Sequence, residues 1–147
     1  MKGTQMINFT NVVHINRSAD EVYGYLSDLE HTPEWNWAIT ETRKITPGPP
    51  AIGTRYRQTR SVPQPSTEAL EITGLKPSQL IEIQGTLAQF SAQLSYHLRE
   101  THGGTELTNT VHLEPQRALR FIAPVLVGRI KRAVGDNLNE LRARLEA

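Results

Sequence analysis

The chain has 147 residues, a formal charge of +1 from 16 basic and 15 acidic residues, and no cysteine. This length fits one domain, residues 1–147, that can bury a core unaided, and the lack of cysteine excludes disulfides and thiolate chemistry. The balanced charge gives no basis for nucleic-acid binding driven by counterion release. Without a long apolar run or an apolar leader segment, we expect a cytoplasmic protein with no integral membrane association.

The first part of the chain predicts a strand followed by two short helices. In residues 7–16 apolar side chains alternate with polar ones, which is typical of a half-buried strand. Ser18 and Glu21 then form a capping-box pattern, and an apolar stripe at helical spacing follows them. In "HTPEWN", Thr32 as cap and Pro33 at the first helical position predict the second short helix.

The middle of the chain alternates between strand patterns and turn-forming residues. The breaks read "PGPPAIG", "PQP", "LKPS" and "HGG", all rich in residues that favour turns. The last break predicts a hairpin with either His102-Gly103 or Gly103-Gly104 as its turn, because both registers keep the same faces together. The six predicted strands are 38–46, 54–62, 67–73, 80–87, 92–101 and 105–114.

Residues 118–147 return to a helical period and predict one long amphipathic helix. Pro124 falls early in this run, so we expect a kink or a late helix start there. The apolar stripe consists of Leu119, Ile122, Leu126, Ile130, Val134, Leu138, Leu141 and Leu145.

Together these elements predict an α+β fold in which two short helices follow the first strand and a long helix ends the chain. A single helix cannot cover a flat antiparallel sheet of about seven strands, so the sheet must curve around it. This geometry favours an internal cavity between sheet and helix. The small residues Gly85 and Ala92, on the expected inner faces, also favour space inside.

Three segments carry a family resemblance: "HINRSADEVYGYLSDLEHTPEW", "GTRYRQTR" and the final "NLNELRARLEA". With this order of elements, the chain resembles the helix-grip fold of the SRPBCC superfamily (START-like and birch-pollen-allergen-like proteins), and within it the polyketide cyclase/dehydrase branch. The resemblance covers essentially the whole chain. It implies a cavity for lipids, hormones or polyketides and, as in many members, a homodimer. It supplies no shared catalytic signature.

Both tryptophans lie close together, in "LSDLEHTPEWNWAITE". We expect Trp35 to close the core between the short helices and the sheet, since burying an indole stabilises a fold by about 2–3 kcal/mol. Trp37 enters the next strand and either lines the cavity or packs at the surface. Accordingly, Trp35→Ala is expected to reduce mainly stability and Trp37→Ala mainly ligand binding.

The strand faces assigned to the interior contain no Asp, Glu or His. Their polar residues, Tyr96 and Asn109, either satisfy each other or hold a ligand carbonyl or hydroxyl. The strand "GTRYRQTR" is ambiguous: an inward Arg60 would point to an acidic ligand, but we favour a charged edge strand. The residues expected to contact a ligand are Trp37, Tyr56, Gln58, Leu70, Ile72, Ile83, Leu94, Tyr96, Asn109, Val111, Leu126 and Ile130.

No histidine pair has metal-ligand spacing, and no phosphate loop, serine elbow or zinc pattern occurs. His31, near Asp28, is the one acid/base candidate, although both residue types also cap helices. We therefore predict a protein that binds a hydrophobic, lipid- or polyketide-like small molecule and needs no metal or cofactor. The alternative is a polyketide cyclase/dehydrase-type enzyme acting in the same cavity. A protein-interaction domain is a third hypothesis, which space inside the fold would disfavour.

Overall fold

The computed structural model describes residues 6–115 and 124–147. In chain order its elements are β1 (Ile7–Ile15), α1 (Ala19–Leu26), the 3-10 helix η1 (Leu29–His31), α2 (Thr32–Trp35), β2 (Ile39–Lys44), β3 (Arg55–Arg60), β4 (Ser66–Lys76), β5 (Leu80–Leu87), β6 (Phe90–Thr101), β7 (Gly104–Pro115) and α3 (Pro124–Glu146).

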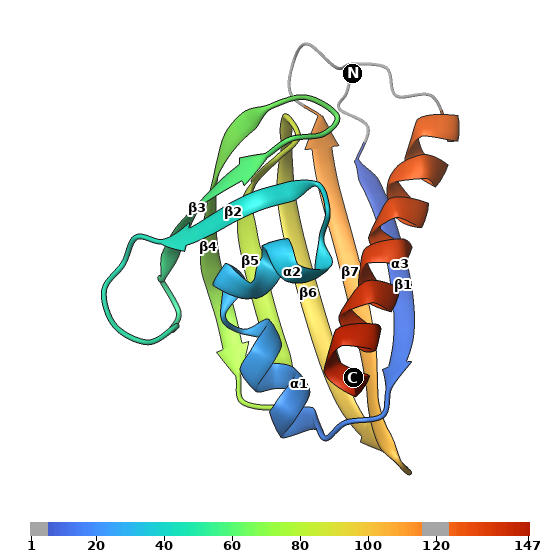
Figure 1. The fold of residues 1–147 in the computed structure, drawn as a ribbon. Helices are drawn as coiled ribbons and strands as arrows, with labels where there is room; N and C mark the ends of the chain where they lie inside the picture. Colours follow the sequence, from blue (N-terminus) through green and yellow to red (C-terminus); the bar gives the residue numbers. More distant parts are fainter. Residues whose placement is uncertain (1–5, 116–123) are drawn as a thin grey trace.

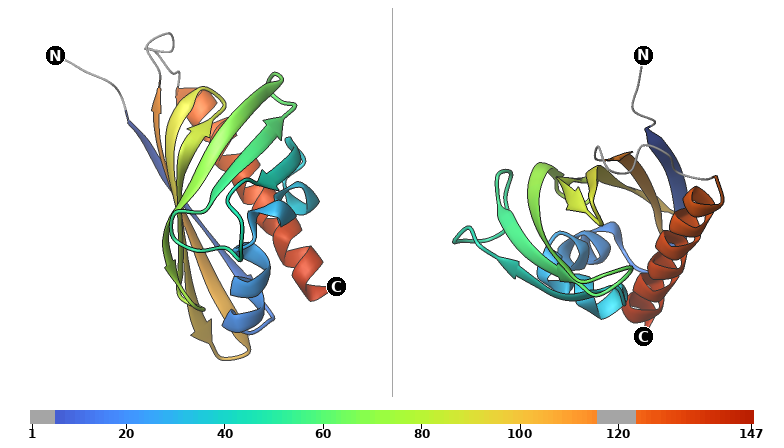
Figure 2. Two further views of the ribbon diagram at one scale, coloured as in Figure 1. Left: turned by 90° about the vertical axis from the view of Figure 1, so that its left-hand side faces the viewer. Right: turned by 90° about the horizontal axis from the view of Figure 1, so that it is seen from above.

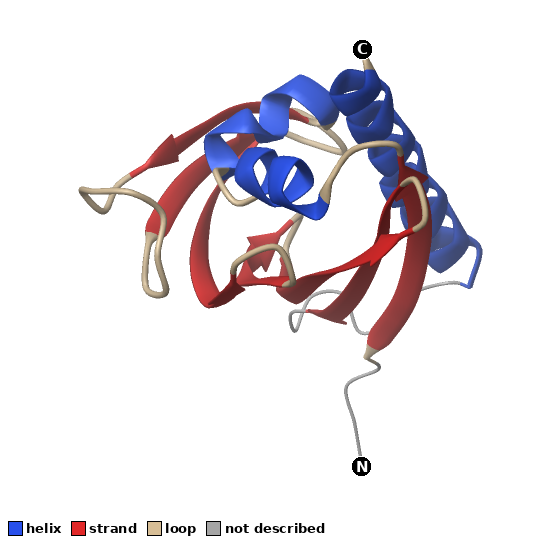
Figure 3. Ribbon diagram, turned by 90° about the horizontal axis from the view of Figure 1, so that it is seen from below, coloured by secondary structure: helices blue, strands red, loops and turns tan. Residues whose placement is uncertain are grey.

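The seven strands of the described chain form one antiparallel sheet with the order β1-β7-β6-β5-β4-β3-β2. The sheet is strongly curved, and α3 runs across its open side along β1 (Figure 1). Two further views show that α1 and α2 cover the rest of that side (Figures 2 and 3). The predicted α+β helix-grip architecture is confirmed.

Local hydrogen bonds explain why the first helices begin where they do. The Ser18 hydroxyl oxygen accepts the Glu21 backbone N–H (3.1 Å) and donates to the Glu21 carboxylate (3.2 Å), which confirms a reciprocal cap at the start of α1. Asp28 caps η1 by accepting the Glu30 backbone N–H (3.1 Å). Thr32 was predicted to cap α2 but is its first residue, because η1 runs directly into that helix.

The hairpin turns fix the register of the sheet. Thr101 pairs with Gly104, so His102-Gly103 forms the turn between β6 and β7, one of the two predicted registers. Between β5 and β6 the turn is Ala88-Gln89, and both residues have positive φ, at 48° and 71°. A two-residue turn of this kind usually contains glycine. In the β5–β6 turn, Ala88 and Gln89 therefore adopt a left-handed backbone conformation that their residue types disfavour.

Helix α3 is described from Pro124 to Glu146, whereas Leu119 and Ile122 lie outside the described residues. The predicted kink or late start at Pro124 depends on residues 116–123, so it stays a prediction. The C-terminal part of the predicted stripe packs tightly, with Leu138 and Leu141 fully buried. None of the helices in the described segments combines the length and hydropathy of a membrane-spanning segment.

The interior contains two apolar clusters. The larger one joins β1 and the central strands to α1, α2 and the C-terminal half of α3. The smaller one lies under the first turns of α3, around Phe9, Phe90 and Val111. Ala92 belongs to this smaller cluster, so it fills space instead of leaving it.

Gly85 also has a packing role, unlike the role expected from the sequence. A Cβ atom on Gly85 would lie 2.3 Å from the Ala69 carbonyl oxygen and 2.7 Å from the Leu70 Cδ2 atom. Strand β4 therefore approaches β5 closely at this point, where only glycine fits. The inference that Gly85 and Ala92 leave room for a ligand is wrong.

Candidate functional site

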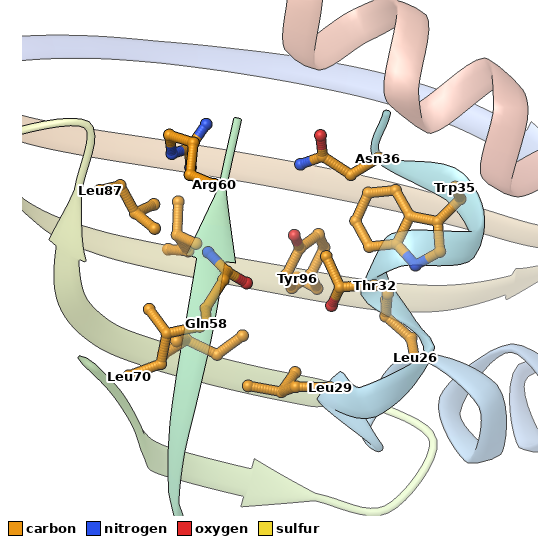
Figure 4. A pocket seen from close by; sticks show the side chains of 12 residues that line it. Leu26, Leu29, Thr32, Trp35, Asn36, Gln58, Arg60, Leu70, Leu87 and Tyr96 are labelled. Carbon is orange, nitrogen blue, oxygen red and sulfur yellow. The ribbon is translucent and has the colours of Figure 1, made fainter. Parts of the chain in front are cut away.

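A small cavity lies between the helical segment 26–36 and the inner face of strands β3 to β6. Its volume is about 60 Å³, well below the roughly 300–1,000 Å³ of pockets that hold drug-sized ligands. Figure 4 shows its walls, with Gln58 and Arg60 on one side, Tyr96 in the middle and the helical residues on the other side. The lining residues are Leu26, Leu29, Thr32, Trp35, Asn36, Gln58, Arg60, Leu70, Ile83, Leu87, Leu94 and Tyr96.

The facing of β3, which the sequence left ambiguous, is defined by burial. Tyr56 and Gln58 are buried, whereas Arg55 and Arg57 are exposed. Arg60 continues the inward set, and only 13% of its side chain is exposed. The strand is not an edge strand, because β2 pairs with its outer side. The favoured interpretation of Arg60 as part of a charged edge is therefore wrong.

A buried carboxylate explains how Arg60 is held at the cavity wall. Glu68 on β4 is 2% exposed in its side chain, and its Oε2 atom accepts from Arg60 Nε at 2.7 Å. The same atom accepts the Ala88 backbone N–H (2.6 Å) and the Ser66 hydroxyl (3.4 Å). The other oxygen, Oε1, accepts from Gln58 Nε2 at 2.9 Å. Four donors thus converge on one carboxylate, which satisfies it as a buried acceptor.

This network extends across three strands. The Thr42 hydroxyl on β2 donates to Gln58 Oε1 at 3.2 Å, so the Gln58 amide is held from both sides. Thr42, Gln58 and Glu68 are all buried. Because each side chain fixes the next, the network defines one position for Arg60 beside the cavity.

The expectation that the inner faces contain no Asp, Glu or His is wrong, because Glu68 is buried there. The available signal was strict alternation along the predicted strand 67–73, since Glu68 stands two residues before Leu70 and four before Ile72. A charged residue is rarely buried without a partner. The partner, Arg60, lies on a strand whose facing was ambiguous, so the two assignments depended on each other.

Arg60 keeps hydrogen-bonding capacity that the protein does not use. Its Nε atom is paired with Glu68, and its Nη1 atom reaches the Val62 carbonyl oxygen only at 3.5 Å. Nη2 makes no hydrogen bond to the described residues. Because a guanidinium has five N–H donors, Arg60 can donate to a ligand oxygen without leaving Glu68.

Tyr96 contributes a second donor to the cavity. Burial raises the pKa of its phenol well above the ordinary value of 10.0, so the hydroxyl stays protonated and can donate a hydrogen bond at neutral pH. Asn109 pairs with Tyr96 across the β6–β7 ladder, but its amide donates instead to the Ser95 carbonyl oxygen (3.2 Å). Asn109 is buried away from the cavity lining.

The predicted contact residues other than Asn109 divide into four groups. Gln58, Leu70, Ile83, Leu94 and Tyr96 line the cavity together, while Tyr56 and Ile72 are buried in the larger cluster. Val111 and Ile130 belong to the smaller cluster. Trp37 and Leu126 are at the surface, 68% and 42% exposed.

The helical side of the cavity was absent from the predicted set. Leu26, Leu29, Thr32, Trp35 and Asn36 all face the sheet from one short segment. Trp35 is buried as expected, and it forms part of the cavity wall as well as of the core. The apolar stripe of α1 could have predicted this side of the cavity. A helix face that packs toward the concave side of a curved sheet also borders any cavity between them.

The acid/base candidate of the sequence analysis lies outside the cavity. The His31 ring stacks on Tyr25 with centroids 4.4 Å apart, and its nitrogens lie 3.4 Å from Glu34 and 3.9 Å from Asp28. This half-exposed cluster does not contribute to the lining of the cavity. No group of three or more potential metal ligands occurs within residues 6–115 and 124–147.

Comparisons with known proteins agree with this architecture. The family model described as "Polyketide cyclase / dehydrase and lipid transport" matches residues 6–146. A START superfamily protein from Mycobacterium smegmatis matches with a TM-score of 0.81 and 16% identity over 98% of each chain. The Zhui aromatase/cyclase from Streptomyces sp. R1128 matches with a TM-score of 0.77 and 15% identity over 97% of this chain and 94% of that one.

Ara h 8.0201 also shares the fold, with a TM-score of 0.75 and 11% identity over 96% of this chain and 98% of that chain. A search of curated proteins finds no match. The solved structures share the fold at low identity, whereas the family model covers nearly the whole sequence. The chain therefore belongs to the polyketide cyclase/dehydrase and lipid transport family, within the SRPBCC superfamily.

Proposed function

We propose that this protein binds an apolar small molecule, lipid- or polyketide-like, in the cavity between the sheet and the helical segment 26–36. The observation that carries the proposal is the composition of the cavity wall. Leucine, isoleucine and tryptophan side chains surround a few hydrogen-bonding groups, among them Arg60 and Tyr96. Such a wall holds an apolar body and orients one or two oxygen atoms.

The cavity must enlarge to accept such a ligand, because about 60 Å³ is roughly the space of two water molecules. One short segment supplies the whole helical side of the wall. Its helices are brief, and η1 and α2 together span only residues 29–35. An outward movement of this segment would widen the cavity, and it would have to release the hydrogen bond that the Lys44 backbone N–H on β2 donates to Glu30 Oε2 at 2.9 Å. We therefore assign ligand entry to this side.

A cyclase-type activity is the second candidate, and the buried Arg60 favours it. A guanidinium and a protonated phenol beside one cavity can donate to the oxygens of a bound ketone and stabilise negative charge that develops there. The described wall, however, contains no carboxylate or imidazole free to remove a proton. Glu68 already accepts four hydrogen bonds. The binding function accordingly ranks first.

Titration with the neutral fluorescent probe N-phenyl-1-naphthylamine tests the binding site. We expect Leu94→Phe, which fills the cavity, to weaken binding at least tenfold. Ile52→Phe is the matched control because Ile52 is exposed on the loop before β3. Thermal melts should verify that both variants fold. Equal binding by the two variants would refute the location of the site, and no binding by the wild type would refute the function.

Hydrogen–deuterium exchange of 1-phenyl-1,3-butanedione, followed by proton NMR in deuterated water, separates carrier from enzyme. A carrier leaves the exchange rate at C2 unchanged. A protein that polarises ketones accelerates it, and Arg60→Gln should then remove the acceleration.

A further inference from the structure

The charge beside the cavity is balanced, which bears on the ligand that the cavity accepts. The Arg60 guanidinium is always positive in proteins. Glu68 meets it at 2.7 Å and accepts from four donors, which is the role of an ionised carboxylate. The pair is therefore close to neutral when seen from the cavity, although Arg60 alone lines the wall.

We propose that Glu68 is a specificity-determining residue that makes the cavity select uncharged carbonyl or hydroxyl groups over carboxylates. This inference rests on the proposed binding function and names the chemical class of its ligand. It also reverses the expectation that an inward Arg60 binds an acidic ligand, because Glu68 of the protein itself is already the acidic partner of Arg60.

Two ligands of equal shape, one with a neutral carbonyl group and one with a carboxylate, differ in the free energy of entering the cavity. A neutral carbonyl group accepts a hydrogen bond from Arg60 or Tyr96 and loses little hydration on entry. A carboxylate loses much more hydration, and the attraction of Arg60 is largely cancelled by the repulsion of Glu68 a few ångströms behind it. Tyr96 is the only other titratable group in the described wall, and it stays neutral because burial raises its pKa.

The hydrogen-bond network holds the Glu68 carboxylate beside Arg60, so the two charges stay compensated. Glu68 is tied to β3 through Gln58 and Arg60, and to the β5–β6 turn through the Ala88 backbone N–H. A carboxylate held by four donors does not turn away to admit a competing anion. The same contacts hold the Arg60 guanidinium in place, so Nη2 remains available as a donor whose charge is already compensated.

Paired titrations with 2-naphthamide and 2-naphthoate test the proposal, because these probes differ in charge but hardly in shape. We expect the wild type to bind the amide at least tenfold more tightly than the carboxylate. Glu68→Gln keeps the side-chain shape and frees the charge of Arg60, so it should shift the preference toward 2-naphthoate by at least thirtyfold. Glu71→Gln, an exposed residue on the same strand, makes the same charge change and should leave the preference unaltered.

Arg60→Gln provides a second variant in case Glu68→Gln does not fold, as judged by circular dichroism. It leaves the Glu68 charge uncompensated and should weaken 2-naphthoate binding further. Equal or tighter binding of 2-naphthoate by the wild type overturns the proposal, as does an unchanged preference in folded Glu68→Gln. If N-phenyl-1-naphthylamine binds while the charge preference is absent, the binding function stands and this inference fails. If no probe binds the wild type, the binding function itself fails.

Discussion

The inner face of the sheet has two halves with different chemistry. Strands β1, β6 and β7 direct mainly apolar side chains toward α3, among them Val13, Leu98 and Leu107. Strands β2, β3 and β4 carry Thr42, Gln58, Arg60 and Glu68 on their inner faces as one hydrogen-bonded network, of which Gln58 and Arg60 line the cavity. Both halves are buried. The comparison shows that in this fold a polar strand can form a wall of the interior when its charges are paired there.

The largest expected effect comes from replacing one partner of the buried pair. Glu68→Leu leaves the Arg60 charge without compensation, and we expect a loss of about 3–5 kcal/mol in the free energy of unfolding. The double variant Arg60→Met/Glu68→Leu turns this part of the polar half into an apolar one and should recover at least half of the loss. Recovery stays incomplete because Gln58 and the Ala88 N–H lose their acceptor.

Urea unfolding of the wild type, both single variants and the double variant measures this coupling. If the double variant is no more stable than Glu68→Leu alone, the pair is not an energetic unit. The two halves of the sheet would then differ in amino-acid composition but not in how their side chains contribute to stability.

The two tryptophans give the next effect, since one belongs to the interior and the other does not. Trp35 is 7% exposed and lines the cavity, so we expect Trp35→Ala to lower stability by about 3–5 kcal/mol and to weaken probe binding. Trp37 is largely exposed, and Trp37→Ala should change stability by less than about 0.5 kcal/mol. Its expected effect on binding is small, contrary to the prediction from the sequence.

Thermal melts and titrations with N-phenyl-1-naphthylamine on both variants provide the measurement. A large loss of binding in Trp37→Ala would mean that the ligand reaches over the edge of the helical segment. The cavity as described would then be only part of the site.

The apolar half was predictable from the sequence because alternation and burial agree there. Leu94, Tyr96 and Leu107 were assigned to the interior from spacing alone, and all three face it. The caps at Ser18 and Asp28 were equally readable, because they depend on neighbouring residues. These features require no knowledge of distant contacts.

The polar half was not predictable in the same way. Placing Glu68 inside requires knowing that Arg60 is inside, and each placement alone breaks the rule that charges stay in water. The direction of Trp37 depends on the backbone at Asn36, where α2 ends (φ −118°, ψ 102°). The cavity volume depends on how whole side chains pack, which spacing along one strand does not determine.

Tyr56 provides a smaller effect within the polar half. Its hydroxyl is buried without a hydrogen-bond partner among the described residues, and the Leu29 N–H approaches it outside hydrogen-bond geometry. Burial, with a further contribution from Asp28, raises the pKa of Tyr56 to about 12. The folded state therefore keeps its proton longer than the unfolded state, and stability falls as the pH rises from about 10 to 12.

We expect Tyr56→Phe to raise stability at pH 7 by about 1 kcal/mol, because it removes an unpaired buried polar group. It should also reduce the loss of stability between pH 7 and pH 11 by roughly 1 kcal/mol, because pH 11 lies between the pKa values of the unfolded and folded states. Tyr23, Tyr25 and Tyr96 contribute to the remaining loss, since their pKa values are also raised, mainly by burial. Urea unfolding at pH 7 and pH 11 measures both effects. An unchanged pH dependence would show that burial does not raise the pKa of Tyr56 in solution.

The smallest expected effect concerns two hairpin turns, the β6–β7 turn and the β5–β6 turn. The β6–β7 turn of the apolar half places Gly103 at φ 94°, whereas the β5–β6 turn places Ala88 and Gln89 at positive φ without a glycine. Glu68 holds the latter turn through the Ala88 N–H. Gln89→Gly relieves the backbone cost of a left-handed residue, so we expect a gain of about 0.5–1 kcal/mol.

Gln79→Gly is the control, since Gln79 lies in the β4–β5 turn and is not a positive-φ position. It should be neutral or slightly destabilising, because glycine there only adds freedom to the unfolded chain. Chemical unfolding of both variants measures the difference. If Gln89→Gly does not increase the free energy of unfolding, the hydrogen bond from the Ala88 N–H to Glu68 does not hold the turn at positive φ. The polar network would then end at Arg60 and Gln58, and the backbone of the turn would adopt another conformation in solution.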